Sequence, residues 1–483
     1  MAIRLHTSFI NGKRLPRSGP IVKRFNPGRT RQEASRCSHA TADAAEAAMD
    51  AASASFPCWS DQPVKERVQI LEHVLQRIEK KASGFARMIT GENGKTLKES
   101  RLEVAAGLAD ARFHLADALR SRKETVSSPN TAARTRLFLE PVGVYVLITP
   151  WNFPLATILR KLIPALAFGN TAVVKPSGYT PGIASLLFDV VAAAKIPVGV
   201  ANLVLGGGSE VGPALTAHEA LRGVSFTGST ANGLHIARSV AGRDVRLQLE
   251  MGGKNSLLVL QDADLEAAVD AAVVGAFSCA GQWCTGTGRA IVEETIYDAF
   301  CSRLVGRTNA LVVGPGDNPK TQMGPLISRE SLRETREAIR IARSEGARVR
   351  CGGKAPSLRK GQGGNFLLPT VLSDVDETMA AFHEELFAPV LPVVRARNFE
   401  DGLRLANQGN FGLSASIFTN NKKYAEVFLR KVEAGIAHVN LHTAFRTPNL
   451  PVAGWRDSGR GIPECGRFAR DFYTRPRAAY VAT

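Results

Sequence analysis

The sequence predicts two consecutive α/β domains, each a parallel sheet wrapped by helices. The chain has 483 residues, which is too long for one ordinary hydrophobic core. From about residue 143 onward, short apolar stretches alternate with helical patterns, as is typical of parallel sheets with helices on both faces. The stretch LQLEMGGKNS carries paired glycines that suit a hinge, so we expect the domain boundary there.

Residues 41–120 precede the sheets and have a helical pattern. TADAAEAAMDAASASF opens with Thr41, a suitable helix N-cap residue. VKERVQILEHVLQRIEKKASGFARMIT then places apolar residues three and four positions apart. We therefore expect surface helices that bury one face against a core.

Two series of strands and helices follow. The first contains the apolar stretches VGVYVLIT, TAVVKP, ANLVLG and GVSFTG, with helical segments between them. The second begins at NSLLVLQDADLEAAV, where Asp262 and Asp264 stand at a helix start. It continues through RAIVEETIYDAFCSRLVGRTN and NFLLPTVLSDV. Each series predicts one parallel sheet.

Two further segments read as edge strands. RTRLFLEP, at residues 134–141, and RDFYTRPRAAYVAT, at residues 470–483, alternate apolar and polar residues. Because an exposed, unpaired strand promotes association, these segments indicate contact with a second subunit.

The composition is that of an ordinary globular protein, with 44% hydrophobic and 22% charged residues. We expect a cytoplasmic protein without membrane spans, since no apolar stretch has the length of a signal peptide core or a transmembrane helix. The net charge of +17 favours anionic ligands. Because the basic residues are dispersed over amphipathic patterns, we expect no nucleic-acid partner.

Two of the seven cysteines lie in GAFSCAGQWCTGTGR, residues 275–289, between small residues that would let a ligand approach. An odd number of scattered cysteines does not indicate a disulfide framework. No spaced Cys/His pair completes a zinc site, so we expect no metal. Cys279 and Cys284 are therefore packing residues, or one of them does chemistry.

Several short motifs occur in a fixed order along the chain. They are TPWNFP (149–154), VVKPS (173–177), FTGSTANG (226–233), LEMGGK (249–254), GQWC (281–284), EELFAP (384–389) and PVAGWRDSGRG (451–461). This ordered set resembles the NAD(P)-dependent aldehyde dehydrogenase superfamily. The flanking sequences are most similar to its 2-oxoglutarate semialdehyde and succinate semialdehyde branches.

The resemblance implies the aldehyde dehydrogenase fold. A Rossmann-like dinucleotide-binding domain would comprise residues 1–119 and 142–250, and an α/β catalytic domain residues 251–450. Residues 120–141 and 466–483 would form a small β oligomerisation arm that crosses to another subunit. A homodimer or homotetramer is the expected assembly.

The resemblance also implies a mechanism. Cys284 matches the nucleophile that forms a thiohemiacetal and then a thioester. Asn152 matches the side-chain donor to the oxyanion, with the Cys284 backbone N–H as its partner. Glu250 matches the base that activates water, so the product is a free acid. Cys279 is then a small buried packing residue.

The cofactor residues follow from the same motifs. Gly228, Ser229 and Gly233 would hold the pyrophosphate at a helix N-terminus. The remaining candidates surround the two riboses and the nicotinamide, and they are Trp151, Lys175, Ser177, Glu385 and Phe387.

Some positions depart from the family pattern. Gly178 stands where NAD-preferring relatives often carry a Glu. Without this carboxylate, the 2′-phosphate of NADP would meet Lys175 in a positive field. The expected cofactor is therefore NAD or NADP. Ala388, Val452 and Ala453 replace usual Gly, Phe and Gly residues. These changes affect cofactor and substrate geometry.

The substrate is indicated by two residues. Arg160, eight positions after Asn152, would face the aldehyde tunnel and bind a distal carboxylate, as in succinate semialdehyde enzymes, or form a salt bridge at a helix surface or interface. Benzaldehyde-type enzymes often carry an Arg at this position as well. The second carboxylate-binding Arg of those enzymes is Ser278 here. Trp283 beside the nucleophile would narrow the pocket or stack on a flat substrate. Acidic semialdehydes such as 2,5-dioxopentanoate rank first and aromatic aldehydes of the benzaldehyde type second.

Two readings from other classes stay open. One is a non-catalytic binding or structural protein with the same fold. The presence of Cys284, Glu250 and Asn152 argues against it. The other is an acylating enzyme that makes a coenzyme A thioester, against which Glu250 speaks.

Overall fold

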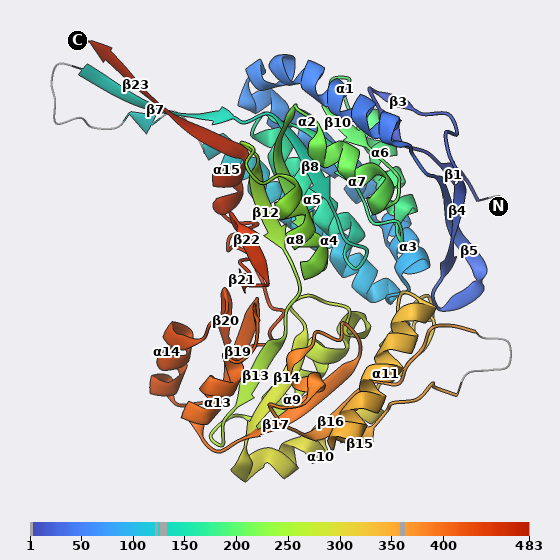
Figure 1. Cartoon of the computed structure of the whole chain (residues 1–483), viewed down its shortest axis with the longest axis vertical. Coiled ribbons are helices and arrows are strands. Elements are labelled where there is room, and N and C mark those ends of the chain that lie inside the picture. Colours follow the sequence, from blue (N-terminus) through green and yellow to red (C-terminus); the bar gives the residue numbers. More distant parts are fainter. Residues whose placement is uncertain (1–2, 121–123, 126–132, 358–362, 483) are drawn as a thin grey trace.

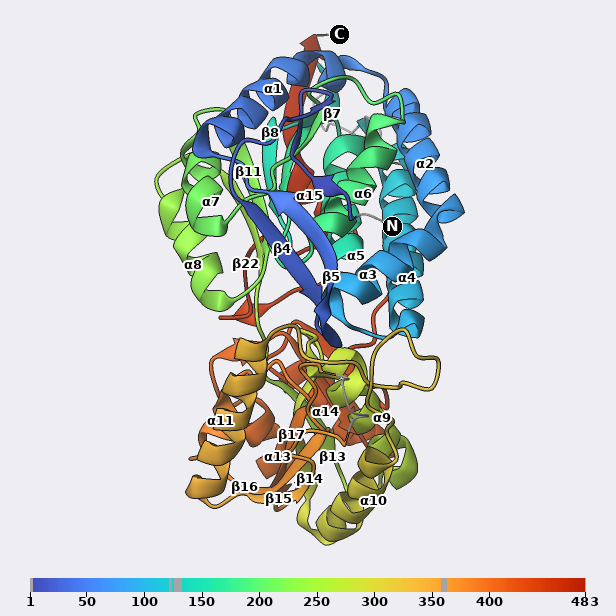
Figure 2. The ribbon, with the colours of Figure 1, turned by 90° about the vertical axis from the view of Figure 1, so that its right-hand side faces the viewer.

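The computed structural model describes residues 3–120, 124–125, 133–357 and 363–482. Two α/β bodies follow one another along the longest axis of the molecule (Figures 1 and 2). None of the helices within the described ranges is both long and apolar enough to cross a membrane.

The first body contains an eight-stranded sheet. Its strands, in spatial order, are β22 (Gly459–Gly461), β12 (Arg246–Glu250), β11 (Leu221–Thr227), β8 (Val144–Ile148), β9 (Thr171–Lys175), β10 (Ala201–Leu203), β2 (Phe9–Ile10) and β3 (Lys13–Arg14). The five central strands, from β12 to β10, pair in parallel, and the outer strands pair antiparallel. The predicted first strand-helix series is this parallel core.

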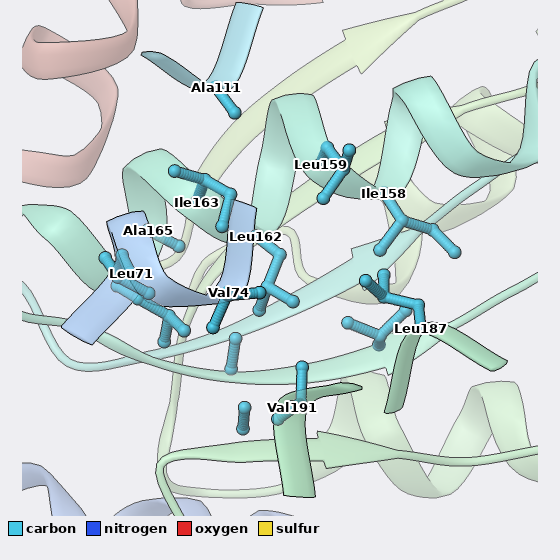
Figure 3. Close-up of a cluster of buried hydrophobic side chains, with 14 of the residues drawn as sticks. Leu71, Val74, Ala111, Ile158, Leu159, Leu162, Ile163, Ala165, Leu187 and Val191 are labelled. Carbon is cyan, nitrogen blue, oxygen red and sulfur yellow. The ribbon is translucent and has the colours of Figure 1, made fainter. Parts of the chain in front are cut away.

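Helices cover both faces of this sheet. They are α1 (Ala42–Asp61), α2 (Val64–Lys80), α3 (Ala82–Asn93), α4 (Leu97–Arg120), α5 (Pro154–Ala167), α6 (Pro181–Ala192), α7 (Gly208–Ala217) and α8 (Thr230–Ser239). Alternate strand residues face opposite sides, so Tyr145 and Leu147 pack with α2 to α6, whereas Val144 and Val146 pack with α1, α7 and α8. Figure 3 shows part of the first cluster. The helical prediction for residues 41–120 is confirmed, and Thr41 caps α1 by accepting a hydrogen bond from Ala44 N–H.

Helix α5 lies at the centre of this core. All of its residues are buried except Arg160, which is partly buried. A helix that is apolar on every side belongs inside a protein. The adjacent cations Arg160 and Lys161 interrupt this apolar surface, so their charges require partners inside the protein.

The second body contains a seven-stranded sheet. Its order is β15 (Arg348–Cys351), β16 (Thr370–Val375), β17 (Val390–Ala396), β14 (Thr287–Glu293), β13 (Asn255–Val259), β19 (Ser414–Phe418) and β20 (Ile436–Val439), and all pairs are parallel except β15 with β16. The covering helices are α9 (Leu265–Phe277), α10 (Tyr297–Asn309), α11 (Arg329–Glu345), α12 (Ala380–His383), α13 (Phe399–Ala406) and α14 (Lys422–Lys431), with short 3₁₀ turns at Ser278–Gly281 and Glu294–Ile296. Asp264 caps α9 as expected, by accepting from Ala267 N–H.

Smaller sheets complete the fold. β1 (Leu5–His6), β5 (Arg29–Ser38) and β4 (Ile21–Asn26) form one sheet, and β18 (Phe411–Gly412) pairs with β21 (Trp455–Arg456). β23 (Thr474–Ala482) pairs antiparallel with β7 (Ala133–Pro141), which also pairs with β6 (Glu124–Thr125). This three-stranded arm projects from the first body (Figure 1).

One predicted strand begins later than expected. Residues Phe468–Tyr473 form helix α15, although the sequence was expected to be extended from residue 470. Ala469, Phe472 and Tyr473 lie on the face that joins the core of the first body. This tertiary packing outweighs the local alternation, so β23 starts only at Thr474.

Candidate active site

The predicted site residues gather where the parallel strands of the first sheet end. Trp151 and Asn152 follow β8, Lys175 ends β9, Gly228 follows β11 and Glu250 ends β12. Chain order reverses between β8 and β11, since β9 and β10 lie on one side and β12 on the other. Such a switch point, at the carboxyl ends of the strands, is where dinucleotides bind in open α/β sheets.

Cys284 lies in a loop of the second body, between the 3₁₀ turn and β14. The side-chain amide of Asn255, the first residue of β13, donates to the carbonyls of Cys284 (2.8 Å) and Gly286 (2.7 Å). The hydroxyl of Thr443 donates to the Thr285 carbonyl at 2.8 Å. The loop is therefore fixed from two sides.

The turn that precedes this loop is tightly wound. Cys279, Ala280 and Gly281 have φ values of 52°, 56° and 69°, all in the left-handed region. Gln282 anchors the end of the turn, since its Oε1 accepts from Ile327 N–H at 2.8 Å and its Nε2 donates to the Cys279 carbonyl at 3.1 Å. Strain of this kind persists only where surrounding contacts hold it.

The two cysteines of this segment have different surroundings. Cys279 is buried, its thiol pKa is raised by burial, and its backbone N–H donates to Glu99 Oε1 at 2.6 Å. Cys284 is only partly buried. Burial, followed by the carboxylate of Glu385, raises the pKa of the Cys284 thiol to about 12, while the Arg160 guanidinium opposes this shift. Cys284 is therefore a thiol at neutral pH in the absence of ligands.

Asn152 lies beside the nucleophile loop. Its Nδ2 donates to the carbonyl of Gln282, two residues before Cys284, at 3.0 Å. Its Oδ1 accepts from Phe153 N–H at 3.1 Å, which orients the amide. Because an amide nitrogen has two N–H groups, one donor is left for another acceptor.

Glu250 is buried at the end of β12. Its Oε1 accepts from Glu464 N–H at 3.2 Å, and its Oε2 is buried without a hydrogen-bond partner among the described residues. Burial, reinforced by the negative charge of Glu464, raises the pKa of Glu250 well above its ordinary value. A raised pKa suits a base that works near neutral pH.

A buried cluster of charges adjoins Glu250. Lys161 Nζ donates to Glu464 Oε1 at 2.6 Å, and Arg160 Nη1 donates to Glu464 Oε2 at 3.3 Å. Arg160 Nε also donates to Asp110 Oδ2 at 3.0 Å, and Arg446 holds both oxygens of Asp110 at 2.8 and 3.0 Å. Although burial alone would raise them, these cations hold the pKa values of Asp110 and Glu464 below their ordinary values.

Arg160 therefore makes ion pairs inside the protein, with Asp110 and Glu464. Its side chain is only 15% exposed, so the pair is buried and not on a helix surface. The Arg160 guanidinium also lowers the pKa of the Cys284 thiol, against the larger effect of burial.

The turn after β11 has the features of a phosphate site. Ser229 is the N-cap of α8, and its side chain makes no capping bond, so the helix N-terminus is available to an anion. A Cβ at Gly228 would lie 2.6 Å from the Phe226 ring, and one at Gly233 would lie 2.4 Å from Met251 Sδ. Packing of the Phe226 and Met251 side chains therefore requires glycine at both positions. The donor set fits the pyrophosphate of a dinucleotide.

The end of β9 carries Lys175 and Ser177. Lys175 Nζ donates to the Pro176 carbonyl at 3.2 Å, and burial lowers its pKa to about 8. Ser177 Oγ accepts from Tyr179 N–H at 3.3 Å. Both side chains thus stay near the strand end, where a ribose would be held.

Glu385 and Phe387 reach the same region from the second body. Glu385 Oε1 accepts from Gly253 N–H at 2.9 Å, and burial raises the Glu385 pKa to about 7. The Phe387 ring stands edge-on to Trp151, with 5.6 Å between centroids. These contacts bring the candidates for the nicotinamide end together across the two bodies.

Trp283 belongs to an aromatic wall next to Cys284. Its ring centroid lies 5.4 Å from that of Phe153 and 6.4 Å from that of His442. His442 in turn contacts Phe445 edge-on at 6.3 Å. The wall combines a loop of the first body with residues 442–445 of the second.

Comparison with known proteins identifies the family. The model of the aldehyde dehydrogenase family matches residues 16–479. The chain belongs to this family. Among its relatives, the α-ketoglutaric semialdehyde dehydrogenase of Bacillus subtilis (strain 168) is 35% identical over 477 residues, which cover 99% of this chain and 98% of the relative.

Solved aldehyde dehydrogenase structures share the fold. Betaine aldehyde dehydrogenase from Staphylococcus aureus, in complex with NAD+, has a TM-score of 0.95 and 31% identity, covering 99% of this chain and 95% of that one. An E. coli NADP dependent enzyme has a TM-score of 0.95 and 32% identity, covering 99% and 98%. The family and fold inferred from the motifs are confirmed.

Sequence reasoning missed several residues of this aldehyde dehydrogenase site. Lys161, Asp110, Glu464 and Arg446 form its buried charge cluster together with Arg160. The only local signal was the pair of cations in the apolar helix α5. This pair predicts buried anionic partners but does not indicate which residues they are.

Proposed function

We propose that this aldehyde dehydrogenase oxidises an acidic ω-semialdehyde, such as 2,5-dioxopentanoate, to the free acid with NAD or NADP. The Cys284 thiol loses its proton to solvent, and the thiolate attacks the aldehyde carbon and forms a thiohemiacetal oxyanion. The side-chain amide of Asn152 and the backbone N–H of Cys284 stabilise its oxyanion. A nicotinamide cofactor held by Lys175, Glu385 and the turn at Gly228 would supply the hydride acceptor that converts this thiohemiacetal into a thioester on Cys284.

Glu250 completes the reaction. Its carboxylate takes a proton from water, and the resulting hydroxide attacks the thioester, so the carboxylic acid leaves and the Cys284 thiolate is restored. The network of Glu464 and Lys161 holds Glu250 in place through the Glu464 backbone N–H. Steady turnover that strictly required coenzyme A would contradict this role.

The charges of the buried cluster beside Glu250 support an acidic substrate. Arg160, Lys161 and Arg446 supply three positive charges, whereas only Asp110 and Glu464 are held ionised against them. Burial and the negative charge of Glu464 raise the pKa of Glu250, which disfavours its charged form. The three cations outnumber the two carboxylates that they hold ionised, which favours the approach of a substrate carboxylate.

Arg446 is the better placed of the two arginines to bind this carboxylate. Its Nε is buried and has no hydrogen-bond partner in the described ranges. Its Nη2 lies 3.6 Å from the Cys465 sulfur, and Cys465 belongs to the apolar cluster against which Cys284 packs. We infer that Arg446 takes the role that Arg at position 278 has in succinate semialdehyde enzymes, while Arg160 supports it through Asp110.

Substrate profiling tests this assignment. We expect a higher kcat/KM for 2,5-dioxopentanoate and succinate semialdehyde than for hexanal or benzaldehyde. Arg446→Met, which keeps an apolar stem, should lower kcat/KM for the acidic substrates about 10- to 100-fold, as expected for a lost charged hydrogen bond. Arg397→Met removes an exposed arginine of the second body and serves as the control.

The outcomes separate the two substrate classes. Equal losses on acidic and neutral aldehydes would remove the role of Arg446. A preference of the wild-type enzyme for benzaldehyde would instead make the aromatic wall around Trp283 the determinant of specificity.

We also propose that the arm joins two copies of the chain. β7 and β23 pair over nine residues, and Tyr480 is 75% exposed. A narrow ribbon without its own core is stable only when something covers it. Light scattering should give a dimer or tetramer for the full chain and a smaller species after deletion of residues 475–483; an unchanged mass would contradict the proposal.

A further inference from the structure

The residue that follows β9 decides which ribose a dinucleotide site accepts. In dinucleotide-binding sheets, an acidic residue after this strand binds the 2′-hydroxyl, whereas a nearby arginine accommodates a 2′-phosphate. Here the strand ends at Lys175, and the next three residues are Pro176, Ser177 and Gly178. No carboxylate is present at this turn to repel a phosphate.

A guanidinium from outside the sheet lies at this turn. Arg24 is on β4, in the small N-terminal sheet. Its Nη2 lies 3.2 Å from the position that a Cβ on Gly178 would occupy, and among the described residues other than the chain neighbours of Gly178 it is the only group within 4 Å of that position. Its guanidinium carbon stands 5.3 Å from the centroid of the Tyr179 ring. Arg24 thus lies where the side chain of an acidic residue would begin.

Arg24 has no anionic partner. Among the described residues it makes no ion pair or hydrogen bond, and its Nε is buried and unpartnered. The carboxylate acting on it, Glu92, is engaged elsewhere: it accepts from Ser35 Oγ, from Gly182 N–H at 2.7 Å and from Ile183 N–H at 2.9 Å. A partly buried, unpaired guanidinium is costly, so it favours a ligand that supplies the missing charge.

Two nearby features suit a phosphate. Lys175, on the same turn, bonds only to a backbone carbonyl, so its ammonium has donors left. Arg24 and Tyr179 also line a cavity of 370 Å³, which leaves room for the guanidinium to adjust to a ligand. A planar guanidinium matches phosphate oxygens in a two-pronged geometry.

We propose that Arg24, together with Lys175, binds the 2′-phosphate of NADP and makes NADP the preferred cofactor of this enzyme. The N-terminal sheet would then contribute a specificity residue to the cofactor domain. This inference rests on the cofactor site of the proposed function and adds to it the choice of cofactor.

Binding of two cofactor fragments tests the inference without turnover. Adenosine 2′,5′-bisphosphate and 5′-AMP differ only in the 2′-phosphate, and calorimetry gives both Kd values. We expect the full-length wild-type protein to bind the bisphosphate at least about tenfold more tightly, since charged hydrogen bonds to phosphate are worth that much. Arg24→Leu should lower this ratio by about tenfold or more, and Arg24→Lys should restore part of it.

A second variant tests the same contact from the other side. Gly178→Glu places a carboxylate against the flexible end of Arg24, at a residue whose φ lies outside the left-handed region. It should reduce the ratio to about one and leave 5′-AMP bound. Arg29→Leu is the matched control, because Arg29 belongs to the same sheet and pairs with Asp317 on the surface.

The outcomes are distinct. The role of Arg24 is overturned if the wild-type protein binds both nucleotides with similar Kd values. It is also overturned if the ratio of the two Kd values is the same for Arg24→Leu as for Arg29→Leu. Neither result contradicts the proposed reaction. Failure of the wild-type protein to bind either nucleotide, or to oxidise any aldehyde with either cofactor, overturns the cofactor site and with it the proposed function.

Discussion

Gly281 controls the position of the nucleophile, and replacing it with alanine tests this directly. Its φ is +69°, a conformation that costs an L-residue about 1–2 kcal/mol. A Cβ would lie 2.2 Å from the Ala388 carbonyl oxygen and 2.9 Å from the Ala276 carbonyl oxygen. Ordinary contact begins at 3.4 Å, so backbone must move by about 1.2 Å on one side or the other.

The displacement falls three residues before Cys284. The Asn152 to Gln282 hydrogen bond of 3.0 Å would be broken or distorted by it. Because a misplacement of about 1 Å typically costs about 100-fold in rate, we expect kcat/KM of Gly281→Ala to fall about 100-fold. The Cys284 thiol itself should remain present and open to alkylation.

The loss of activity in Gly281→Ala is measured by steady-state kinetics. Thiol alkylation followed by mass spectrometry checks that Cys284 is accessible, and thermal unfolding checks that the variant is folded. Gly306→Ala is the control, since Gly306 is exposed on α10 and a Cβ there meets nothing within 4 Å. That variant should be active and as stable as the wild type or slightly more so. If Gly281→Ala retained activity within threefold of the wild type, or lost it only in proportion to unfolded protein, the loop would not be set by this glycine.

Other predictions concern the charged groups of the site. Glu250→Gln should keep a burst of reduced cofactor but slow the steady state by about 10²- to 10⁴-fold, and an unchanged steady-state rate would refute the role of Glu250. Alkylation of Cys284 should speed up about tenfold per pH unit from pH 7 to 10, because its pKa of about 12 leaves the thiolate fraction far from saturation; a plateau near pH 8 would contradict this. Glu385→Gln should accelerate alkylation at pH 8.5, where removal of the carboxylate lowers the thiol pKa, and have little effect at pH 5.5, since Glu385 with a pKa of about 7 is already protonated there. Glu464→Leu should cost about 3–5 kcal/mol of unfolding free energy, because it leaves the buried Lys161 ammonium without its carboxylate partner. The double variant with Lys161→Met should cost less than the sum of the single changes, and additive losses by denaturant titration would count against the pairing.

The sequence predicted the large elements because their signals are local. The apolar stretches around residues 143–149 and 171–176 became β8 and β9, and an acidic cap such as Asp264 marked a helix start. The N-terminal sheet had no comparable signal, since β1 has two residues and β4 alternates exposed and partly buried positions. Its place beside Gly178 depends on tertiary contacts that no local pattern encodes.

The candidate site likewise contains residues with a local sequence signal and residues without one. Cys284, Asn152 and Glu250 were found because each stands in a short motif at the end of a strand or within a tight loop. Their roles stay predictions until the variants are tested. Arg160 was singled out, but its partners could not be, because Asp110 is 50 positions away and Glu464 is 304 positions away.

In the proposed function, substrate recognition combines a reaction centre held by strand ends with charged side chains that come from loops. The reacting groups are held by strand ends and by the backbone bonds around Cys284. Arg446 comes from a connection after β20, and it reaches Asp110 across 336 positions. We propose that Arg446 supplies the positive charge that is absent at Ser278, without any change in the position of Cys284. Because loops vary more freely than the sheets that position them, the family's reaction can be retained while the carboxylate ligand changes its origin.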